Sequence, residues 1–239
     1  SDVPVNLFQL SWLENHGVRP ATDPELFAFR GIRGSDGELR AVSLVITDRL
    51  ALVDARDRET ARHFGRWFRE QSIAFEHIVS AEASVRPFWE AYRARPSEEA
   101  GGDQEMEARL VRPQRMYRLE TGAWEGDGGS RPEPTGVRRA TLADLDPLFF
   151  ASAHMHREET LQDPLERDPS SFREHVRHRV ESDRSFVWFN SSNQLQFKAD
   201  VSAESRYGVQ ISGVYTAPKM RGRGIATRAL HDICETLFE

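Results

Sequence analysis

The residues VQISGVYTAPKMRGRGIAT, Val209–Thr227, run from an apolar strand pattern through a proline-marked break into a turn with two glycines and the start of a helix. Such a turn aims several backbone N–H groups at one point, beside the partial positive charge of a helix N-terminus. Gly222 and Gly224 lack a Cβ, so the backbone can approach a diphosphate closely or adopt a positive φ. The segment therefore predicts an anion-binding cradle between a strand and a helix.

Side chains of the same turn add to this pattern. Arg221 and Arg223 supply cationic donors, and Thr227 places a hydroxyl in the first helical turn. The whole stretch resembles the acetyl-CoA signature of the GNAT superfamily of N-acetyltransferases, in which a strand that closes near a proline runs into R-G-x-G-I-A; here three residues separate Val214 from Pro218. A structural turn that binds nothing is the alternative. The resemblance implies acetyl-CoA as the cofactor, bound by Val214, Tyr215, Thr216, Arg221, Gly222, Arg223, Gly224, Ile225, Ala226 and Thr227.

Composition restricts the classes of partner. The 239 residues carry a formal net charge of -6, with acidic residues interleaved among the arginines, which argues against a nucleic-acid partner. No apolar run reaches the roughly 18 residues needed to span a bilayer, so no membrane partner is expected. The first residues, SDVPVNLFQL, lack the pattern of a signal peptide. A single cysteine suggests a reducing compartment, so we expect a cytoplasmic protein.

A glycine-, proline- and acid-rich segment, GAWEGDGGSRPEPTG at Gly122–Gly136, has the composition of an interdomain linker. We place the boundary near Gly128. The chain is thereby divided into an N-terminal domain over residues 1–127, a linker over 128–136 and a C-terminal domain over 137–239.

In the N-terminal domain the patterns predict strands, a helix, a strand, a helix and a further strand. This order resembles the second half of the GNAT fold, but the place of the phosphate turn carries Arg58–Thr60 and no glycine. We expect a smaller, degenerate GNAT-like α/β domain or a docking domain, without an acetyl-CoA of its own. The expected elements are strands at Leu26–Ile32, Ala41–Ala55 (broken at Asp48-Arg49), Phe75–Val79 and Arg109–Leu119, and helices at Arg58–Gln71 and from Ser80 or Glu82 to Arg93.

The C-terminal domain begins with a short strand, after which Thr141 and Asp144 form the pattern of a capping box. Two helices, three antiparallel strands, the anion turn and a last helix follow, which is the GNAT order. The predicted fold class is α/β (α+β), with a GNAT-like mixed sheet and flanking helices. The expected elements are strands at Val137–Ala140, Phe186–Asn190, Gln194–Ser202 and Gly208–Thr216, and helices at Leu142–Glu159 and Ser170–Ser182.

The similarity extends beyond the turn. AHMHREETLQDPL at Ala153–Leu165 and FKADV at Phe197–Val201 resemble two-domain bacterial GNAT proteins that carry a variant N-terminal domain. A GNAT domain normally continues past the helix in which Glu239 lies, so we expect the C-terminal part of the fold to be missing from this chain. Either the functional protein extends beyond Glu239, or a second protomer covers the exposed edge at Gly208–Thr216. The second alternative would make the functional protein a homo-oligomer.

The resemblance also implies the chemistry. In GNAT enzymes an amine attacks the thioester of acetyl-CoA directly, so the protein holds the cofactor, polarises the carbonyl and removes a proton from the amine. Backbone N–H groups of Val214, Tyr215 and Thr216 are placed at the carbonyl. The acceptor is an amine of a small molecule, a peptide or a protein lysine. A non-catalytic, acyl-CoA-binding or regulatory module is the alternative function.

For the general base, the first helix of the C-terminal domain offers Glu158 and Glu159, with His154 and His156 nearby in sequence and Glu204 in a turn. A solvated acidic face is the alternative interpretation of the two glutamates. His154 and His156 are two residues apart and point to different faces of a helix, so no metal site is expected. Cys234 lies among apolar residues of the last helix and reads as a core thiol.

Overall fold

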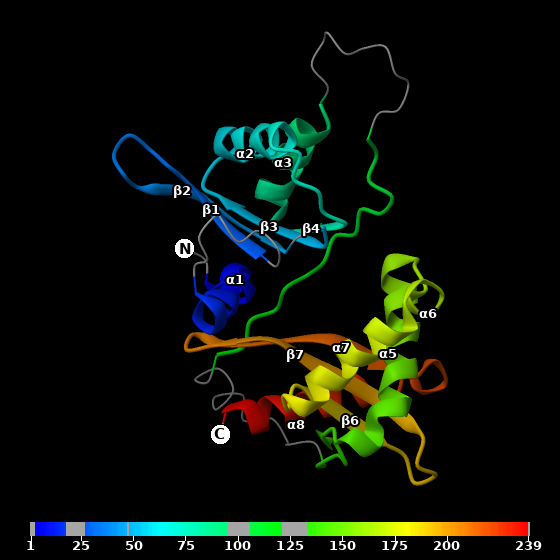
Figure 1. Cartoon of the computed structure of the whole chain (residues 1–239). Coiled ribbons are helices and arrows are strands. Elements are labelled where there is room, and N and C mark those ends of the chain that lie inside the picture. Colours follow the sequence, from blue (N-terminus) through cyan, green and yellow to red (C-terminus); the bar gives the residue numbers. More distant parts are fainter. Residues whose placement is uncertain (1–2, 18–26, 47, 95–105, 121–132, 239) are drawn as a thin grey trace. The chain divides into compact units, whose positions relative to one another are not determined.

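The computed structural model describes residues 3–17, 27–46, 48–94, 106–120 and 133–238. The chain forms two compact units, Ser1–Met116 and Tyr117–Glu239 (Figure 1). This division falls earlier than the boundary that the sequence places near Gly128. Residues 121–132, which include most of the predicted linker, lie outside the described residues, and residues 133–136 have no regular secondary structure.

The first unit contains a four-stranded sheet in the order β1-β2-β3-β4. The first three strands are antiparallel neighbours, and β4 runs parallel to β3. The predicted break between two strands is confirmed at Asp48, which takes a φ of 55° in the turn. The elements are α1 (Val3–His16), β1 (Phe27–Arg33), β2 (Leu39–Ile46), β3 (Leu50–Ala55), α2 (Arg58–Glu70), β4 (His77–Val79) and α3 (Glu82–Arg93).

Helices α2 and α3 cover one face of this sheet (Figure 1). Phe64, Phe68 and Phe88 are almost fully buried there against alanines and valines of β2 and β3. The two helices approach closely at Gly65, where a Cβ would lie 2.2 Å from the carbonyl oxygen of Phe88. The unit therefore has a hydrophobic core of its own.

Two features of the first unit differ from the sequence expectations. The predicted strand at Arg109–Leu119 is wrong, because residues 106–120 are irregular and exposed, with Val111 and Tyr117 about four-fifths exposed. Its alternation is interrupted by Pro113, which has no N–H to give to a sheet. Helix α1 was not expected, since its apolar residues are spread around the helix and not gathered on one face.

The second unit follows the predicted order of elements, with one short helix, α6 (Pro164–Arg167), that was not predicted. Its sheet has the order β5-β6-β7-β8, antiparallel throughout, so the mixed sheet of the chain is the one in the first unit. The predicted α/β fold class is confirmed. The elements are β5 (Arg138–Arg139), α5 (Leu145–Thr160), α6 (Pro164–Arg167), α7 (Pro169–Glu181), β6 (Ser185–Phe189), β7 (Leu195–Ser205), β8 (Gly208–Thr216) and α8 (Ile225–Phe238), with 3-10 turns at Leu142–Asp144 and Pro218–Met220.

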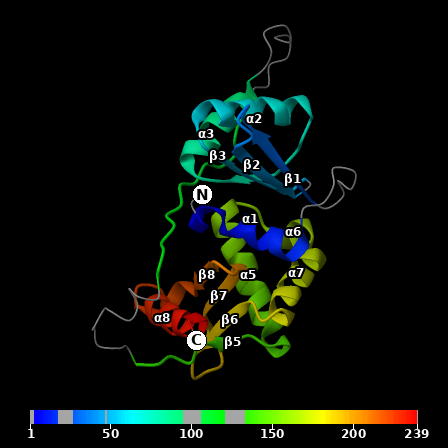
Figure 2. The ribbon, with the colours of Figure 1, turned by 90° about the vertical axis from the view of Figure 1, so that its left-hand side faces the viewer.

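The C-terminal sheet is covered on both faces, with α8 on one side and α5 and α7 on the other (Figure 2). Alternation along β7 turns Phe197, Ala199 and Val201 towards α8. Leu148, Val176 and Val180 fill the opposite side. This arrangement places the start of α8 and the body of α5 on either side of the end of β8.

The predicted capping box is confirmed at the start of the 3-10 turn before α5. The Asp144 carboxylate accepts from the backbone N–H and the hydroxyl of Thr141, at 2.8 and 3.0 Å. Arg138 donates two further hydrogen bonds to the same carboxylate, at 2.7 and 2.9 Å. These contacts hold the pKa of Asp144 at about 2, with the hydrogen bond from Arg138 as the largest cause. Within the described residues, no helix combines the length and hydrophobicity needed to cross a membrane.

Candidate functional site

The turn between β8 and α8, called the cradle below, has the backbone geometry that anion binding requires. Gly222 and Gly224 have φ values of 74° and 69°, a region that favours glycine, and no atom lies within 4 Å of a Cβ built on either. The first intrahelical bond of α8 runs from the N–H of Arg228 to the carbonyl of Gly224. The N–H groups of the preceding residues Ile225, Ala226 and Thr227 therefore have no acceptor within the helix.

A cavity of about 240 Å³ opens at this turn. Seven of the ten residues predicted to bind a cofactor line it, together with Met220. The lining consists of Thr216, Met220, Arg221, Gly222, Gly224, Ile225, Ala226 and Thr227. Backbone donors and the positive end of a helix dipole at a small cavity suit an anion.

Arg221 joins the cradle to α5. Its Nε donates to the carbonyl of Thr216 at 3.0 Å, and one terminal nitrogen contacts both carboxylate oxygens of Glu158 at 2.8 and 3.1 Å. The guanidinium also lies 5.7 Å from the centroid of the Tyr215 ring. The side chain is thus directed across the end of β8, while Arg223 is exposed beside the cradle.

The two glutamates predicted as bases differ in their surroundings. The hydrogen bond from Arg221 lowers the pKa of Glu158 below its ordinary value, which weakens that carboxylate as a base at neutral pH. Glu159 is exposed, and its charge acts on the buried Lys198. The structure therefore brings Glu158 to the cradle as the partner of Arg221 and leaves Glu159 outside it.

His154 lies on the same face of α5 as Glu158, one helical turn earlier. Its Nδ1 is 3.8 Å from a Glu158 oxygen, and its ring packs edge-on against the Tyr215 ring at 5.7 Å between centroids. His156 instead contacts the ring of Phe172. The two histidines point to different sides of the helix, as the sequence predicted.

A bulge interrupts β8 shortly before the cradle. Lys198 pairs with Tyr215 and Asp200 pairs with Ser212, so Ala199 of β7 faces two residues, Gly213 and Val214. Gly213 has a φ of 56°, and a Cβ there would lie 2.7 Å from a carboxylate oxygen of Asp200. One residue of this pair is therefore left out of the regular one-to-one pairing with β7.

A buried ion network supports the bulge, and the sequence analysis did not identify it. Lys198 and Asp200 are almost fully buried, with 2.6 Å between Nζ and Oδ2. Asp200 also accepts from Arg179 and from the hydroxyl of Ser185, each at 2.8 Å. Burial lowers the pKa of Lys198. Burial alone raises the pKa of Asp200, but the charges of Lys198 and Arg179 bring it below its ordinary value. The signal was FKADV, in which charged residues alternate with apolar ones along one strand.

The comparisons with known proteins come from solved structures. No family model matches the chain, and no curated protein matches it. The chain resembles GNAT-family acetyltransferases. An acetyltransferase of that family from Colwellia psychrerythraea matches over 99% of this chain and 81% of its own, with 10% identity and a TM-score of 0.45. A GCN5-related N-acetyltransferase from Sphaerobacter thermophilus matches over 100% and 81%, with 15% identity and a TM-score of 0.43. A predicted acetyltransferase with acetyl-CoA from Clostridium acetobutylicum matches over 42% and 71%, with 19% identity and a TM-score of 0.35.

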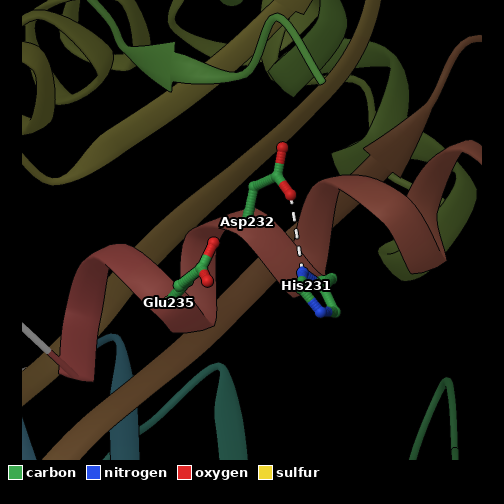
Figure 3. A group of neighbouring side chains, drawn as sticks. All are labelled: His231, Asp232 and Glu235. Atoms are coloured by element: carbon green, nitrogen blue, oxygen red, sulfur yellow. Dashed lines mark ion pairs between the residues drawn. The ribbon is translucent and has the colours of Figure 1, made fainter. Parts of the chain in front are cut away.

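A group of potential metal ligands lies on α8, where the sequence predicted none. His231, Asp232 and Glu235 each offer an atom within 4.8 Å of the others, and Figure 3 shows the ion pair of 3.5 Å between His231 and Asp232. Asp232 already accepts from the N–H and the hydroxyl of Thr135, both at 2.6 Å. These bonds tie the segment before β5 to α8, which gives the carboxylate a structural role.

Cys234, also on α8, is partly buried, and burial raises the pKa of its thiol. A raised pKa keeps the thiol protonated and makes it a poor nucleophile. This agrees with the interpretation of Cys234 as a structural side chain.

Proposed function

We propose that this chain is an N-acetyltransferase that transfers an acetyl group from acetyl-CoA to an amine by direct attack on the thioester. The observation that carries the proposal is the cradle, in which two positive-φ glycines and the first turn of α8 surround a cavity of about 240 Å³. These donors fit the diphosphate of coenzyme A. Acetyl-CoA supplies the activated acetyl group.

Different residues of the chain bind the cofactor and stabilise the transition state. Gly222, Gly224 and the N–H groups that open α8 hold the diphosphate, and the exposed Arg223 adds a positive charge at its edge. The strand residues Val214, Tyr215 and Thr216 run beside the pantetheine arm. The bulge at Gly213–Val214 supplies a backbone donor for the thioester carbonyl oxygen, where negative charge develops in the transition state.

The acceptor is an amine on a small molecule, a peptide or a protein lysine. The proposal places the reaction in the second unit and assigns no cofactor to the first, which lacks a glycine turn before α2. We also propose a cytoplasmic location, for which the single cysteine is the support.

The test is an assay of thiol release from acetyl-CoA by the full chain, with a panel of primary amines and with lysine peptides. Turnover that depends on both substrates, with formation of the acetylated amine detected by mass spectrometry, is the expected result. Saturable binding of acetyl-CoA with no turnover for any acceptor would instead favour a non-catalytic, acyl-CoA-binding module. Absence of binding would overturn both functions.

A further inference from the structure

The face of α5 that looks towards β8 carries His154 directly beside the bulge. The His154 ring contacts the ring of Tyr215, the residue that follows Val214 in the strand. The bulge donors proposed for the thioester carbonyl therefore lie within one residue of the side chain that the imidazole touches. This places a proton acceptor next to the point where an attacking amine has to arrive.

One edge of the imidazole is buried. Nδ1 is buried and, among the described residues, makes no hydrogen bond, with the Glu158 carboxylate oxygen 3.8 Å away. The His154 side chain is 36% exposed, and Nε2 is not among the buried polar atoms of the described residues that lack a partner. Glu158 is in turn held by Arg221. Among the described residues, His154 thus neighbours Glu158 on α5 and Tyr215 on β8, and Arg221 of the cradle contacts both of these residues.

The other bases that the sequence offered are placed less well. Glu158 is engaged by Arg221, and the exposed Glu159 does not line the cavity. His156 packs against Phe172 on another side of α5. Glu204 pairs with Val209, at the end of β8 opposite to the cradle. His154 is the member of this set that combines accessibility with a position at the bulge.

We propose that His154 is the general base of the transfer; the assignment rests on the proposed function. Nε2 of the neutral imidazole takes a proton from the acceptor ammonium, which leaves a free amine. The amine lone pair forms the C–N bond at the thioester carbonyl carbon, and the C–S bond breaks with its electron pair on sulfur. The second amine proton passes to the thiolate, and the imidazolium returns its proton to water.

The experiment compares His154→Gln with the matched control His156→Gln on the same helix, using two acceptors. Benzylamine is an ammonium ion at neutral pH and needs a base, whereas aniline is already uncharged. We expect His154→Gln to lower kcat for benzylamine by about 100-fold or more. For aniline we expect kcat to change by less than about 3-fold, a range that covers a small change in how the amine is positioned. His156→Gln should leave both rates near those of the wild type. Calorimetric affinity for acetyl-CoA should be unchanged in both variants.

Equal losses for the two amines would show that His154 acts on the structure of the site and not on the proton, and would overturn the assignment. Loss of acetyl-CoA affinity in His154→Gln would do the same. A second variant, His154→Ala, is expected to regain benzylamine turnover when imidazole is added, because the added base fills the space. A wild-type chain that binds acetyl-CoA but acetylates neither amine would contradict the proposed function itself and therefore also the role of His154.

Discussion

Arg221 shows how one side chain of the cradle depends on residues far away in sequence. Its contacts with Thr216, Tyr215 and Glu158 connect the end of β8 to α5. The sequence predicted Arg221 as a cofactor ligand and Glu158 as a base, because both types of residue occur in the right segments. It contains no signal that the two side chains bind each other, since that pairing arises only when α5 packs on β8.

The ion pair between Arg221 and Glu158 should make a small, salt-dependent contribution to stability, because both side chains are more than one-third exposed. We expect Glu158→Gln and Arg221→Gln each to lower the thermal midpoint of the second unit by about 1–3 °C, with the double variant no lower than the worse single variant. Scanning calorimetry at low and high salt is the measurement. Glu159→Gln is the matched control, and additive losses would contradict a direct pair.

Asp144 gives a prediction with a defined pH range. Its pKa is about 2 in the folded chain against an ordinary value of 3.8, so the stabilisation is present above about pH 4 and is lost as the pH falls towards 2. Asp144→Asn should cost about 2 kcal/mol at pH 7, since the Asp144 side chain is 8% exposed. Urea unfolding at pH 7 and at pH 3 should show a smaller difference from the wild type at the lower pH. Asp146→Asn, at a side chain that is 70% exposed, is the control. A difference that does not vary with pH would contradict the assigned pKa.

At the scale of elements, the sequence predicted well wherever a pattern is local. The strands and helices of the second unit, the capping box at Thr141 and the positive-φ glycines each follow from a few neighbouring residues. The strand expected at Arg109–Leu119 failed because alternation alone does not supply a partner strand, and Pro113 removes a donor. Helix α1 was missed because its apolar residues form no stripe. The ion network around Asp200 also escaped prediction, since one of its members, Arg179, comes from a different element.

The ion network around Asp200 predicts that substitutions of Asp200 and of Lys198 destabilise the chain to different extents. Asp200 holds three partners, Lys198, Arg179 and Ser185, whereas loss of Lys198 leaves Asp200 two of them. Breaking a buried pair so that a charge is left uncompensated costs about 3–5 kcal/mol. We expect Asp200→Leu to lower the free energy of unfolding by that amount and Lys198→Met to lower it by less. Urea unfolding measures the free energy, and hydrogen exchange at the amides of β6 measures the local loss of stability. The reverse order would contradict the central position of Asp200.

At the scale of the whole chain, the two units present helix N-termini of different kinds. At the start of α2, the Asp57 carboxylate accepts from the N–H of Thr60 at 2.7 Å and from its hydroxyl at 2.9 Å. A carboxylate in this place satisfies the helix end and repels another anion. At the start of α8, positive-φ glycines lead into the helix and a cavity opens instead. We therefore expect one coenzyme site per chain, in the second unit.

The most direct measurement is a calorimetric titration of acetyl-CoA into the full chain and two glycine variants. Gly224→Val puts a branched side chain in the cradle. Gly37→Val, at a φ of 78° in a turn of the first unit, imposes similar backbone strain away from it. The account predicts one site per chain for the wild type and Gly37→Val. Binding in Gly224→Val should be at least about 100-fold weaker, because the loss of two charge-assisted hydrogen bonds costs about 3 kcal/mol or more. Two sites per chain, or equal affinity in Gly224→Val and the wild type, would contradict it.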